Sequence, residues 1–361
     1  MKKALVLGTG KSGEAAAGDL RRRGFAVDFA EGYDLVVASP GLPVKSELQL
    51  GCEELKRRGW KLLAVTGSKG KSSVVKLVAD AINGAGGCAV PCGNYGRPVC
   101  DLLDEAPGWA VVEVSSFQLE TTTLPPDAFV AAAILNLQED HLDRHGSAAV
   151  YHGLKRKLLG MAAFAYDCAA SATADALLAG SYFDNDILRP NGRIAVALMR
   201  AAGLDDGQVA AAFASFRPLP HRMNEVGVFG GVRCIDDSKA TSLAALAAGV
   251  TMAGTGVRLI AGGLPKGDDP NSVKELLTNQ VKKVYLIGAC AETFATAWSE
   301  AVDCEVCGTM DRAVAVAMRE SKPGETVLLS PGTASFDQFK SYGERGDVFA
   351  ALVKKEGQCK K

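Results

Sequence analysis

The sequence predicts an α/β protein built from parallel sheets that are covered by helices. Strand-like apolar runs alternate with helix-compatible segments along the whole chain, which is the pattern of repeated strand–helix–strand units. The chain has 361 residues, too many for one ordinary hydrophobic core, so two or three domains are expected. Its 48% hydrophobic and 22% charged residues are typical of a folded soluble protein. We expect three domains, at residues 1–62, 63–219 and 220–361.

Charge and cysteine content exclude several classes of function. The net charge of −1 gives no electrostatic reason to bind nucleic acid or an anionic membrane. The first apolar run is too short for a signal peptide or a membrane span, so we expect a buried first strand and no membrane insertion. Ten cysteines without regular spacing indicate reduced thiols in a cytoplasmic protein. Two pairs of cysteines are close in sequence, Cys88 with Cys92 and Cys304 with Cys307. Neither has a second pair or a histidine nearby, so buried or incidental thiols are favoured over zinc or redox sites.

The first domain is expected to hold strands at residues 4–7, 25–30 and 34–38 and a helix at 12–23. The turn after the first strand, residues 8–13, has the spacing G-x-G-x-x-G. This spacing occurs in NAD-binding folds, but the acidic residue expected at the end of the second strand is poorly placed. Three alternatives remain open for this turn: an NAD site, a cradle for the phosphates of another nucleotide, and a structural turn.

The central domain opens with the most informative motif of the chain. A strand at residues 61–66 runs into a glycine-rich turn, and helix-compatible residues follow at 74–82. The N–H groups of such a turn point into one concavity, where the helix dipole and a lysine favour a polyphosphate. The next serine can offer its hydroxyl to a phosphate-bound Mg²⁺. A plain loop is the alternative. The residues expected to bind ATP are Gly67, Ser68, Lys69, Gly70, Lys71, Ser72 and Ser73.

The spacing of this motif narrows the class of nucleotide site. It reads G-x-x-G-K-S, two residues tighter than the common G-x-x-x-x-G-K-[ST] loop, because residue 65 is Val and not Gly. Only a subset of ATP-using proteins has the tighter form, so the motif favours that subset.

Acidic residues follow two further strands of the central domain. A strand at residues 109–114 contains Glu113 near its end, and a strand at 129–135 is followed by acids on both sides of His141. Ligands bind at the carboxyl ends of parallel strands, and carboxylates are the ligands that Mg²⁺ prefers. A solvated charge run and a satisfied loop histidine are the alternatives.

The third domain is expected to have its own sheet and core. Strands are predicted at residues 233–235, 257–261, 284–287 and 326–329, with helical segments between them. Polar loops follow the first and the last of these strands, so functional residues are expected there as well.

Five segments, taken in order, resemble the Mur ligases, and within that family most closely the members that add D-glutamate. Because the segments are spread over all three expected domains, the resemblance covers nearly the whole chain. They read Ser-Ser-Phe-Gln-Leu-Glu (115–120), Glu-Asp-His-Leu-Asp-Arg (139–144), Leu-Pro-His-Arg (219–222), Asp-Ser-Lys-Ala-Thr (237–241) and Ser-Phe-Asp-Gln-Phe-Lys (335–340).

The resemblance implies Rossmann-like first and third domains and a central P-loop ATPase-like parallel sheet. It implies an ATP-dependent amide ligase of peptidoglycan synthesis, which adds D-glutamate to UDP-N-acetylmuramoyl-L-alanine through an acyl phosphate. ATP, two Mg²⁺ ions and a monomeric cytoplasmic enzyme belong to this expectation. Another Mur or folylpolyglutamate-type ligase, and a non-catalytic nucleotide-binding homologue, are the alternatives.

Position matching to the family implies roles for individual residues. The implied catalytic residues are Lys71, Glu113, His141, Lys155 and Lys239. The implied metal ligands are Ser72, Glu113, His141 and Lys155, the last as a carbamate, because added CO₂ turns a repelling ammonium into an anionic oxygen donor. Further contacts to the nucleotide are implied for Asn191, Arg222 and Asp237.

The same matching implies contacts to the two substrates. Those to the UDP-sugar-peptide are implied for Gly10, Lys11, Ser12, Gly13, Ser39, Pro40, Gly41, Asn94 and Ser115. Those to D-glutamate are implied for Lys266, Ser335 and Tyr342. Tyr342 stands where the family usually has Phe.

The chain departs from the family pattern in two places. It is shorter than usual, with residues missing from the first domain and after Lys155. The first of these gaps removes the acidic residue on the uridine side and leaves only Glu31 as a substitute. The adenine motif His-Asn-x-x-Asn survives only as Asn191, with Pro190 for the histidine and Ile194 for the second asparagine. These losses indicate either a compacted active enzyme or a weakened one.

Overall fold

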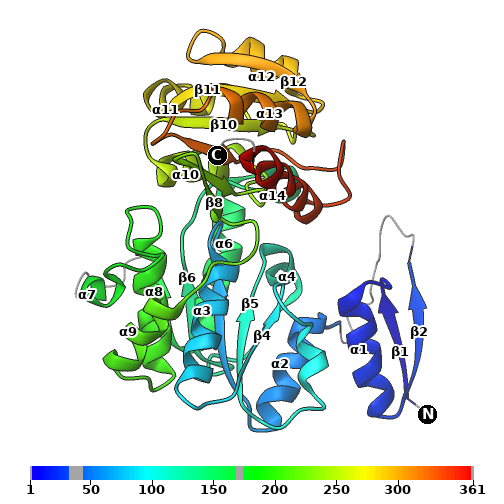
Figure 1. Cartoon of the computed structure of the whole chain (residues 1–361). Helices are drawn as coiled ribbons and strands as arrows, with labels where there is room; N and C mark the ends of the chain where they lie inside the picture. The colour runs from blue at the N-terminus through cyan, green and yellow to red at the C-terminus, as the bar shows by residue number, and fades with distance from the viewer. Residues whose placement is uncertain (1, 32–43, 168–173, 359–361) are drawn as a thin grey trace. The chain divides into compact units, whose positions relative to one another are not determined.

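The computed structural model describes residues 2–31, 44–167 and 174–358. Contacts between residues divide the chain into two units, Met1–Arg217 and Pro218–Lys361. Their strands form three separate sheets, two in the first unit and one in the second (Figure 1). The expected boundary near residue 62 lies inside the first unit, so the three-domain division stays a prediction.

The first sheet has two parallel strands, β1 (Lys2–Leu7) and β2 (Phe25–Ala30), joined through helix α1 (Lys11–Arg22). The expectation of a buried first strand is wrong. Only Val6 of β1 is buried, whereas Leu5 is 61% and Leu7 is 49% exposed. Within the described residues β1 pairs with β2 alone. The expected strand at 34–38, and with it Ser39, Pro40 and Gly41, lies outside the described residues.

The second sheet has five parallel strands in the order β4-β5-β3-β6-β7. The strand β3, predicted at 61–66, is confirmed with those bounds. The sequence analysis missed β4 and β7. The five strands are β3 (Lys61–Thr66), β4 (Ala89–Gly93), β5 (Trp109–Glu113), β6 (Phe129–Ile134) and β7 (Ala162–Asp167).

Helices cover both faces of the second sheet, because alternate residues of the buried strands point to opposite faces. Leu63 and Val65 join the hydrophobic cluster with α3 (Lys71–Gly84), α8 (Arg189–Ala201) and α9 (Asp206–Ser215). Leu62 and Ala64 join the cluster with α2 (Glu47–Arg57) and its neighbours. The shorter elements of this unit are η1 (Val99–Leu102), α4 (Ser116–Thr121), α5 (Leu142–His145), α6 (Ala148–Lys157), η2 (Leu158–Met161) and α7 (Asp175–Leu178).

The second unit contains a six-stranded sheet in the order β12-β11-β10-β13-β9-β8, parallel except for β8, which runs antiparallel to β9. The four predicted strands are confirmed, and the two edge strands β8 and β12 were missed. Its strands are β8 (Asn224–Phe229), β9 (Val232–Asp236), β10 (Val257–Gly262), β11 (Val281–Ile287), β12 (Asp303–Gly308) and β13 (Thr326–Leu329).

Helices also cover both faces of this sheet. One hydrophobic cluster unites α10 (Leu243–Ala253), α11 (Lys274–Gln280), which follows η4 (Pro270–Val273), and α12 (Ala291–Trp298). The other unites α13 (Met310–Glu320) and α14 (Tyr342–Gln358). Among the described residues, none of the helices combines the length and the apolar run that a membrane crossing needs.

The cysteine pairs lie on or beside strands. Cys304 and Cys307 belong to β12, and Cys307 is buried, whereas Cys92 is buried in β4 and Cys88 is exposed just before it. Eight cysteines lie in the described residues, and none of these eight forms a disulfide.

Candidate functional site

The loop between β3 and α3, residues 67–70, has glycine-specific geometry at its two ends. Gly67 has φ +148° and Gly70 has φ +84°, both in the region that disfavours residues with side chains. A Cβ on Gly67 would lie 3.0 Å from Leu135 Cβ, and a Cβ on Gly70 would lie 2.3 Å from Asn191 Nδ2. Backbone conformation and space therefore both require the glycines of the G-x-x-G-K-S motif.

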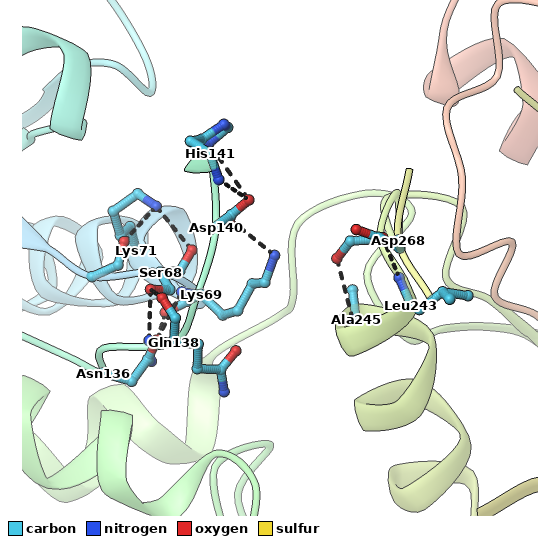
Figure 2. A network of polar contacts seen from close by, with 12 residues as sticks. Ser68, Lys69, Lys71, Asn136, Gln138, Asp140, His141, Leu243, Ala245 and Asp268 are labelled. Atoms are coloured by element: carbon cyan, nitrogen blue, oxygen red, sulfur yellow. Dashed lines mark hydrogen bonds and ion pairs between the residues drawn. The ribbon is translucent and has the colours of Figure 1, made fainter. Parts of the chain in front are cut away.

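The loop is braced by Asn136, two residues beyond the end of β6 (Figure 2). The Ser68 N–H donates to Asn136 O at 3.0 Å, and the Lys69 N–H donates to Asn136 Oδ1 at 2.9 Å. Asn136 Nδ2 donates back to Lys69 O at 2.9 Å and to Asn191 Oδ1 at 3.2 Å. The expectation that successive N–H groups of the loop all face a phosphate is therefore wrong for Ser68 and Lys69. The N–H groups of the first turn of α3 point out of the helix, as in any α-helix.

The Ser68 side chain is buried and holds the loop in place. Its hydroxyl donates to Gln138 O at 3.0 Å and accepts from the Gln138 N–H at 2.9 Å (Figure 2). Tyr151, on helix α6, contacts the same hydroxyl with its own at 3.2 Å. Ser68 is thus fixed by contacts within the protein.

Two lysines converge on one carbonyl oxygen of the loop. Lys71 Nζ donates to Gly67 O at 2.8 Å and to Ser68 O at 3.2 Å, and Lys155 Nζ donates to Gly67 O at 3.0 Å. Lys155 is 1% exposed, and its Nζ lies 4.4 Å from the centroid of the Tyr151 ring. Burial, together with the charge of Lys71, lowers the pKa of Lys155 to about 7. A substantial fraction of this amine is therefore uncharged at neutral pH.

Glu113, at the carboxyl end of β5, offers a buried oxygen with no partner. Its side chain is 2% exposed, and Oε1 accepts from Asn94 Nδ2 at 2.7 Å. Within the described residues Oε2 is buried and makes no hydrogen bond. An unpaired buried carboxylate oxygen is costly, so this atom fits a bound cation.

Ser115, two residues beyond Glu113, is the N-cap of α4. Its hydroxyl accepts from the Gln118 N–H at 3.2 Å, and Gln118 Oε1 accepts from the Ser115 N–H at 2.9 Å, which completes a capping box. The position is therefore determined by the start of a helix, and a contact from Ser115 to the sugar-peptide stays a prediction.

The acidic segment after β6 faces the loop through Asp140. Asp140 Oδ2 lies 3.3 Å from Lys69 Nζ, and Asp140 Oδ1 accepts from the His141 N–H at 3.1 Å (Figure 2). Burial raises the pKa of Asp140, but Lys69 and His141 outweigh it and lower this pKa overall. His141 has φ +53°, and its half-exposed ring lies 5.1 Å from the Phe117 ring.

The residues present fit a magnesium ion that completes its shell with oxygens from elsewhere. Among residues 2–31, 44–167 and 174–358, no group of three or more His, Cys, Asp and Glu side chains is arranged to hold a metal. The predicted set takes only Glu113 and His141 from these residue types. Mg²⁺ commonly keeps waters and phosphate oxygens and takes one or two carboxylates from the protein, which matches the single unpaired oxygen of Glu113.

The glycine turn after β1 borders a cleft of about 640 Å³. Thr9 and Lys11 from the turn line it together with Arg22 of α1 and Arg97, which follows β4. The Thr9 hydroxyl donates to Glu31 Oε2 at 2.5 Å. The structure therefore brings Glu31, the substitute acid noted in the sequence, next to the turn that was predicted to hold the UDP moiety.

In the second unit, the loop after β9 carries two of the predicted residues. Asp237 is buried, and Asp237 Oδ2 accepts from the Ser330 hydroxyl at 2.9 Å. Burial raises the pKa of Asp237 to about 7. Lys239 Nζ lies 4.0 Å from the centroid of the Tyr342 ring, and the Ser238 hydroxyl donates to Tyr342 O at 2.8 Å.

The other predicted residues of this unit lie on neighbouring loops. Ser335 is buried after β13, Lys266 is exposed after β10, and Arg222 lies before β8. Leu264 and Ala334 exchange two backbone hydrogen bonds of 2.9 and 3.1 Å. This pair brings the Lys266 loop beside the Ser335 loop.

The sequence analysis assigned no role to several residues that hold these loops. Asn136 lies two residues beyond the end of β6, so the rule for carboxyl ends of strands could have found it. Tyr151 lies one helical turn before Lys155, which is a weaker signal. Arg345 is fully buried in α14 and had no signal, because arginines in a surface helix are normally exposed.

Comparison with known proteins shows similarity along nearly the whole chain. A family model described as the Mur ligase middle domain matches residues 65–170. A UDP-N-acetylmuramoylalanine–D-glutamate ligase of Acidobacterium capsulatum is 33% identical over 449 residues, which cover 98% of this chain and 96% of that protein. A protein of the same name from Nitratidesulfovibrio vulgaris is 32% identical, with coverage of 97% and 95%.

Solved structures show the same fold. The MurF ligase of Thermotoga maritima in complex with ADP has a TM-score of 0.65 at 16% identity, with coverage of 99% of this chain and 95% of that one. This likeness supports the predicted α/β multi-domain fold. The match to the Acidobacterium protein runs over 449 residues, whereas this chain has 361, so the expectation of a shortened chain is confirmed.

Proposed function

The chain belongs to the UDP-N-acetylmuramoylalanine–D-glutamate ligases of the Mur ligase family, and from this premise we propose how its residues perform the reaction. The activity is the ATP-dependent addition of D-glutamate to UDP-N-acetylmuramoyl-L-alanine in peptidoglycan synthesis. The single observation that best supports the assignment of residues is the braced phosphate loop, with Lys71 and Lys155 on one carbonyl oxygen.

The reaction has two steps that balance in atoms and charge. A carboxylate oxygen of the alanyl group attacks the γ-phosphorus of ATP, and the bond to ADP breaks. The amine of D-glutamate then attacks the carbonyl carbon of the acyl phosphate, loses a proton, and displaces inorganic phosphate. The protein has to stabilise negative charge on the transferring phosphoryl group in the first step.

Lys71 is proposed to supply that stabilisation. Its ammonium donates to two loop carbonyls, Gly67 O and Ser68 O. Phosphoryl oxygens carry more negative charge than a carbonyl oxygen, so the ammonium gains by turning from the loop to the phosphate. A cation placed there acts on charge that develops in the transition state. The N–H groups at the start of α3 add to the same attraction.

The proposed magnesium site is built on Glu113 and Ser72, with His141 and a carbamate of Lys155 as ligands of a second ion. The fit rests on the unpaired Oε2 of Glu113 and on the lowered pKa of Lys155, because only an uncharged amine takes up CO₂. Mg²⁺ bound there would supply positive charge to phosphate oxygens. Asn94 fixes the orientation of the Glu113 carboxylate through Oε1.

The cleft beside the glycine turn is proposed to hold the UDP part of the substrate. Lys11 and the N–H groups of the turn suit a diphosphate, since α1 begins at Lys11 and directs its N-terminal dipole there. The remaining residues proposed to contact this substrate are Gly10, Ser12, Gly13, Ser39, Pro40, Gly41, Asn94 and Ser115.

The polar loops of the second unit are proposed to bind D-glutamate and part of the nucleotide. Lys239 is proposed to act at the reacting centre, where the amine of D-glutamate attacks. D-Glutamate brings two carboxylates, and Lys266 is a cation of the kind that recognises them. Ser335 and Tyr342 complete this set. The proposed nucleotide contacts outside the phosphate loop are Asn191, Arg222 and Asp237.

The proposal also includes a monomeric cytoplasmic enzyme. Light scattering of the purified protein checks the first part, with the mass of one chain as the expected result. Fractionation of cells that express the chain checks the second.

The decisive experiment supplies ATP, Mg²⁺ and UDP-N-acetylmuramoyl-L-alanine with a panel of amino acids, and follows phosphate release and product mass. D-Glutamate alone should give product. Activity with L-glutamate or L-alanine but not with D-glutamate would favour another ligase of this fold. Binding of ATP without product from any amino acid would favour a non-catalytic homologue. A Lys71→Ala variant serves as the control, because equal phosphate release from it would show that the turnover comes from another protein.

A further inference from the structure

Arg345 is a buried cation without an acidic partner at ion-pair distance. It lies in the first turns of α14 (Tyr342–Gln358) and is 1% exposed. It makes no ion pair with any described residue; every hydrogen bond it makes is to a hydroxyl or a backbone carbonyl. A buried charge is tolerated only when its donors are satisfied. The contacts of Arg345 therefore determine where its neighbours can lie.

These contacts tie together two loops of the second unit. Arg345 Nε donates to the Ser238 hydroxyl at 3.0 Å, and Nη2 donates to Ser238 O at 2.8 Å. Nη2 and Nη1 each donate to Thr333 O at 3.2 Å, and Nη1 donates to Ala334 O at 3.3 Å. Ser238 follows β9, and Thr333 and Ala334 follow β13, the strand paired with β9. The guanidinium thus links the carboxyl ends of two adjacent parallel strands.

The partners of Arg345 adjoin the residues proposed to bind the amino acid. Ser238 precedes Lys239 in the chain, and Ala334 precedes Ser335. Ala334 also pairs with Leu264, two residues before Lys266. The loops are also closely packed at Gly263. A Cβ there would lie 2.4 Å from Ala334 O and 3.3 Å from Arg345 Nη1.

We propose that Arg345 is a positioning residue that sets Lys239 and Ser335 for the amino-acid substrate. The inference rests on the proposed function of those two residues. A planar guanidinium reaches the carbonyls of both loops at fixed angles, whereas a lysine ammonium is a single point of charge on a flexible stem. Replacement by lysine keeps the charge and releases one or both loops. A displacement of about 1 Å at a substrate-positioning group can cost up to about 100-fold in rate.

The test compares two matched substitutions, Arg345→Lys and Arg258→Lys. Arg258 is also a largely buried arginine of the second unit, but it pairs with Glu325 at 2.6 Å and makes no contact with either loop. Steady-state kinetics are measured separately for D-glutamate and for UDP-N-acetylmuramoyl-L-alanine, together with thermal unfolding. Arg345→Lys should raise KM for D-glutamate about tenfold or more and leave KM for the UDP substrate nearly unchanged. Arg258→Lys should lower the unfolding temperature without raising KM for D-glutamate relative to KM for the UDP substrate.

A second readout does not depend on activity. Hydrogen exchange of the amides at residues 332–340 should become faster in Arg345→Lys and stay as in the parent in Arg258→Lys. Ser238→Ala removes one arginine contact and the hydrogen bond to Tyr342 O with less risk to folding, and it should show the same two effects at smaller size. A folded Arg345→Lys variant with parental KM for D-glutamate and parental exchange would overturn the proposal. If the parent itself fails to use D-glutamate, the proposed function is wrong, and the exchange result alone decides whether Arg345 holds the loops.

Discussion

Lys71 and Lys155 donate hydrogen bonds to the same backbone oxygen, Gly67 O, at 2.8 and 3.0 Å. One carbonyl cannot neutralise two ammonium groups, so the charge of Lys71 disfavours the charged form of Lys155. Burial is the larger cause, and together with the charge of Lys71 it lowers the pKa of Lys155 to about 7. The proximity of these side chains follows from the fold, since β3 and α6 are far apart in the sequence and adjacent in space at this loop.

Replacing Lys155 should change how stability depends on pH. The folded-state pKa of Lys155 is about 7, whereas an unfolded lysine titrates near 10.4. Between these values the unfolded chain binds more protons than the folded one, so this residue makes the parent more stable as pH rises through that window. The unfolding temperature of Lys155→Met, relative to the parent, should therefore fall from pH 7 to pH 10 in bicarbonate-free buffer.

The matched control for that experiment is Lys157→Met on the same helix. Lys157 Nζ donates to Leu119 O at 3.1 Å and lies away from the two-lysine contact. Its replacement measures how the loss of a lysine from this helix, outside the two-lysine contact, changes the unfolding temperature at each pH. A parallel shift for both variants would contradict the lowered pKa of Lys155.

Glu113→Gln should lower the activity without lowering the stability of the metal-free protein. The change removes the charge of a carboxylate whose Oε2 is buried without a partner, so the metal-free protein should be as stable as the parent or more so. Loss of a metal ligand next to the phosphates should lower kcat about 100-fold or more. Thermal unfolding with and without ATP and Mg²⁺ measures both effects, and undiminished stabilisation by the magnesium nucleotide would argue against a metal at Glu113.

Gly70→Ala should weaken nucleotide binding, and Gly86→Ala should not. Both glycines have φ +84°, so both substitutions carry the same backbone strain, of about 1–3 kcal/mol. A Cβ on Gly70 would also lie 2.3 Å from Asn191 Nδ2, whereas a Cβ on Gly86 meets nothing within 4 Å. KM for ATP should therefore rise only in Gly70→Ala, while both variants lose unfolding temperature. Equal KM values would show that the contact with Asn191 does not shape the loop.

Asp237→Asn should stabilise the protein at high pH. Burial raises the pKa of Asp237 to about 7, above its ordinary value near 3.9, so the parent loses stability from this group as pH rises from about 4 to 7. The unfolding temperature of the variant relative to the parent should rise over the same range. Asp303→Asn, at an exposed position of the same unit, serves as the control for removing a carboxylate that is not buried.

The sequence predicted the elements whose signals are local. The strands at 61–66 and 326–329 have the predicted bounds because both are apolar runs buried on two faces. The edge strands β8 and β12 were missed because they are half-exposed and contain Gly227 or charged residues. The exposure of Leu5 could not be predicted, because it depends on what packs on that face of the sheet and not on the residues of β1 itself.

The candidate site was predictable in composition and not in geometry. The G-x-x-G-K-S spacing identified the loop, since both glycines are required by backbone conformation. No local pattern shows that Asn136 takes the N–H groups of Ser68 and Lys69, because those contacts join residues 67 or more positions apart. The same reason hides Arg345, whose partners precede it by up to 107 positions.

Tyr151 and Lys155 lie one turn apart on α6, and they contact Ser68 and Gly67 respectively. Because one helix contacts two consecutive loop residues, we expect the loop and the helix to move together. A movement of the loop away from α6 would therefore break both contacts. Ser147, which caps α6 by accepting from the Val150 N–H at 3.3 Å, stabilises the helix that carries them.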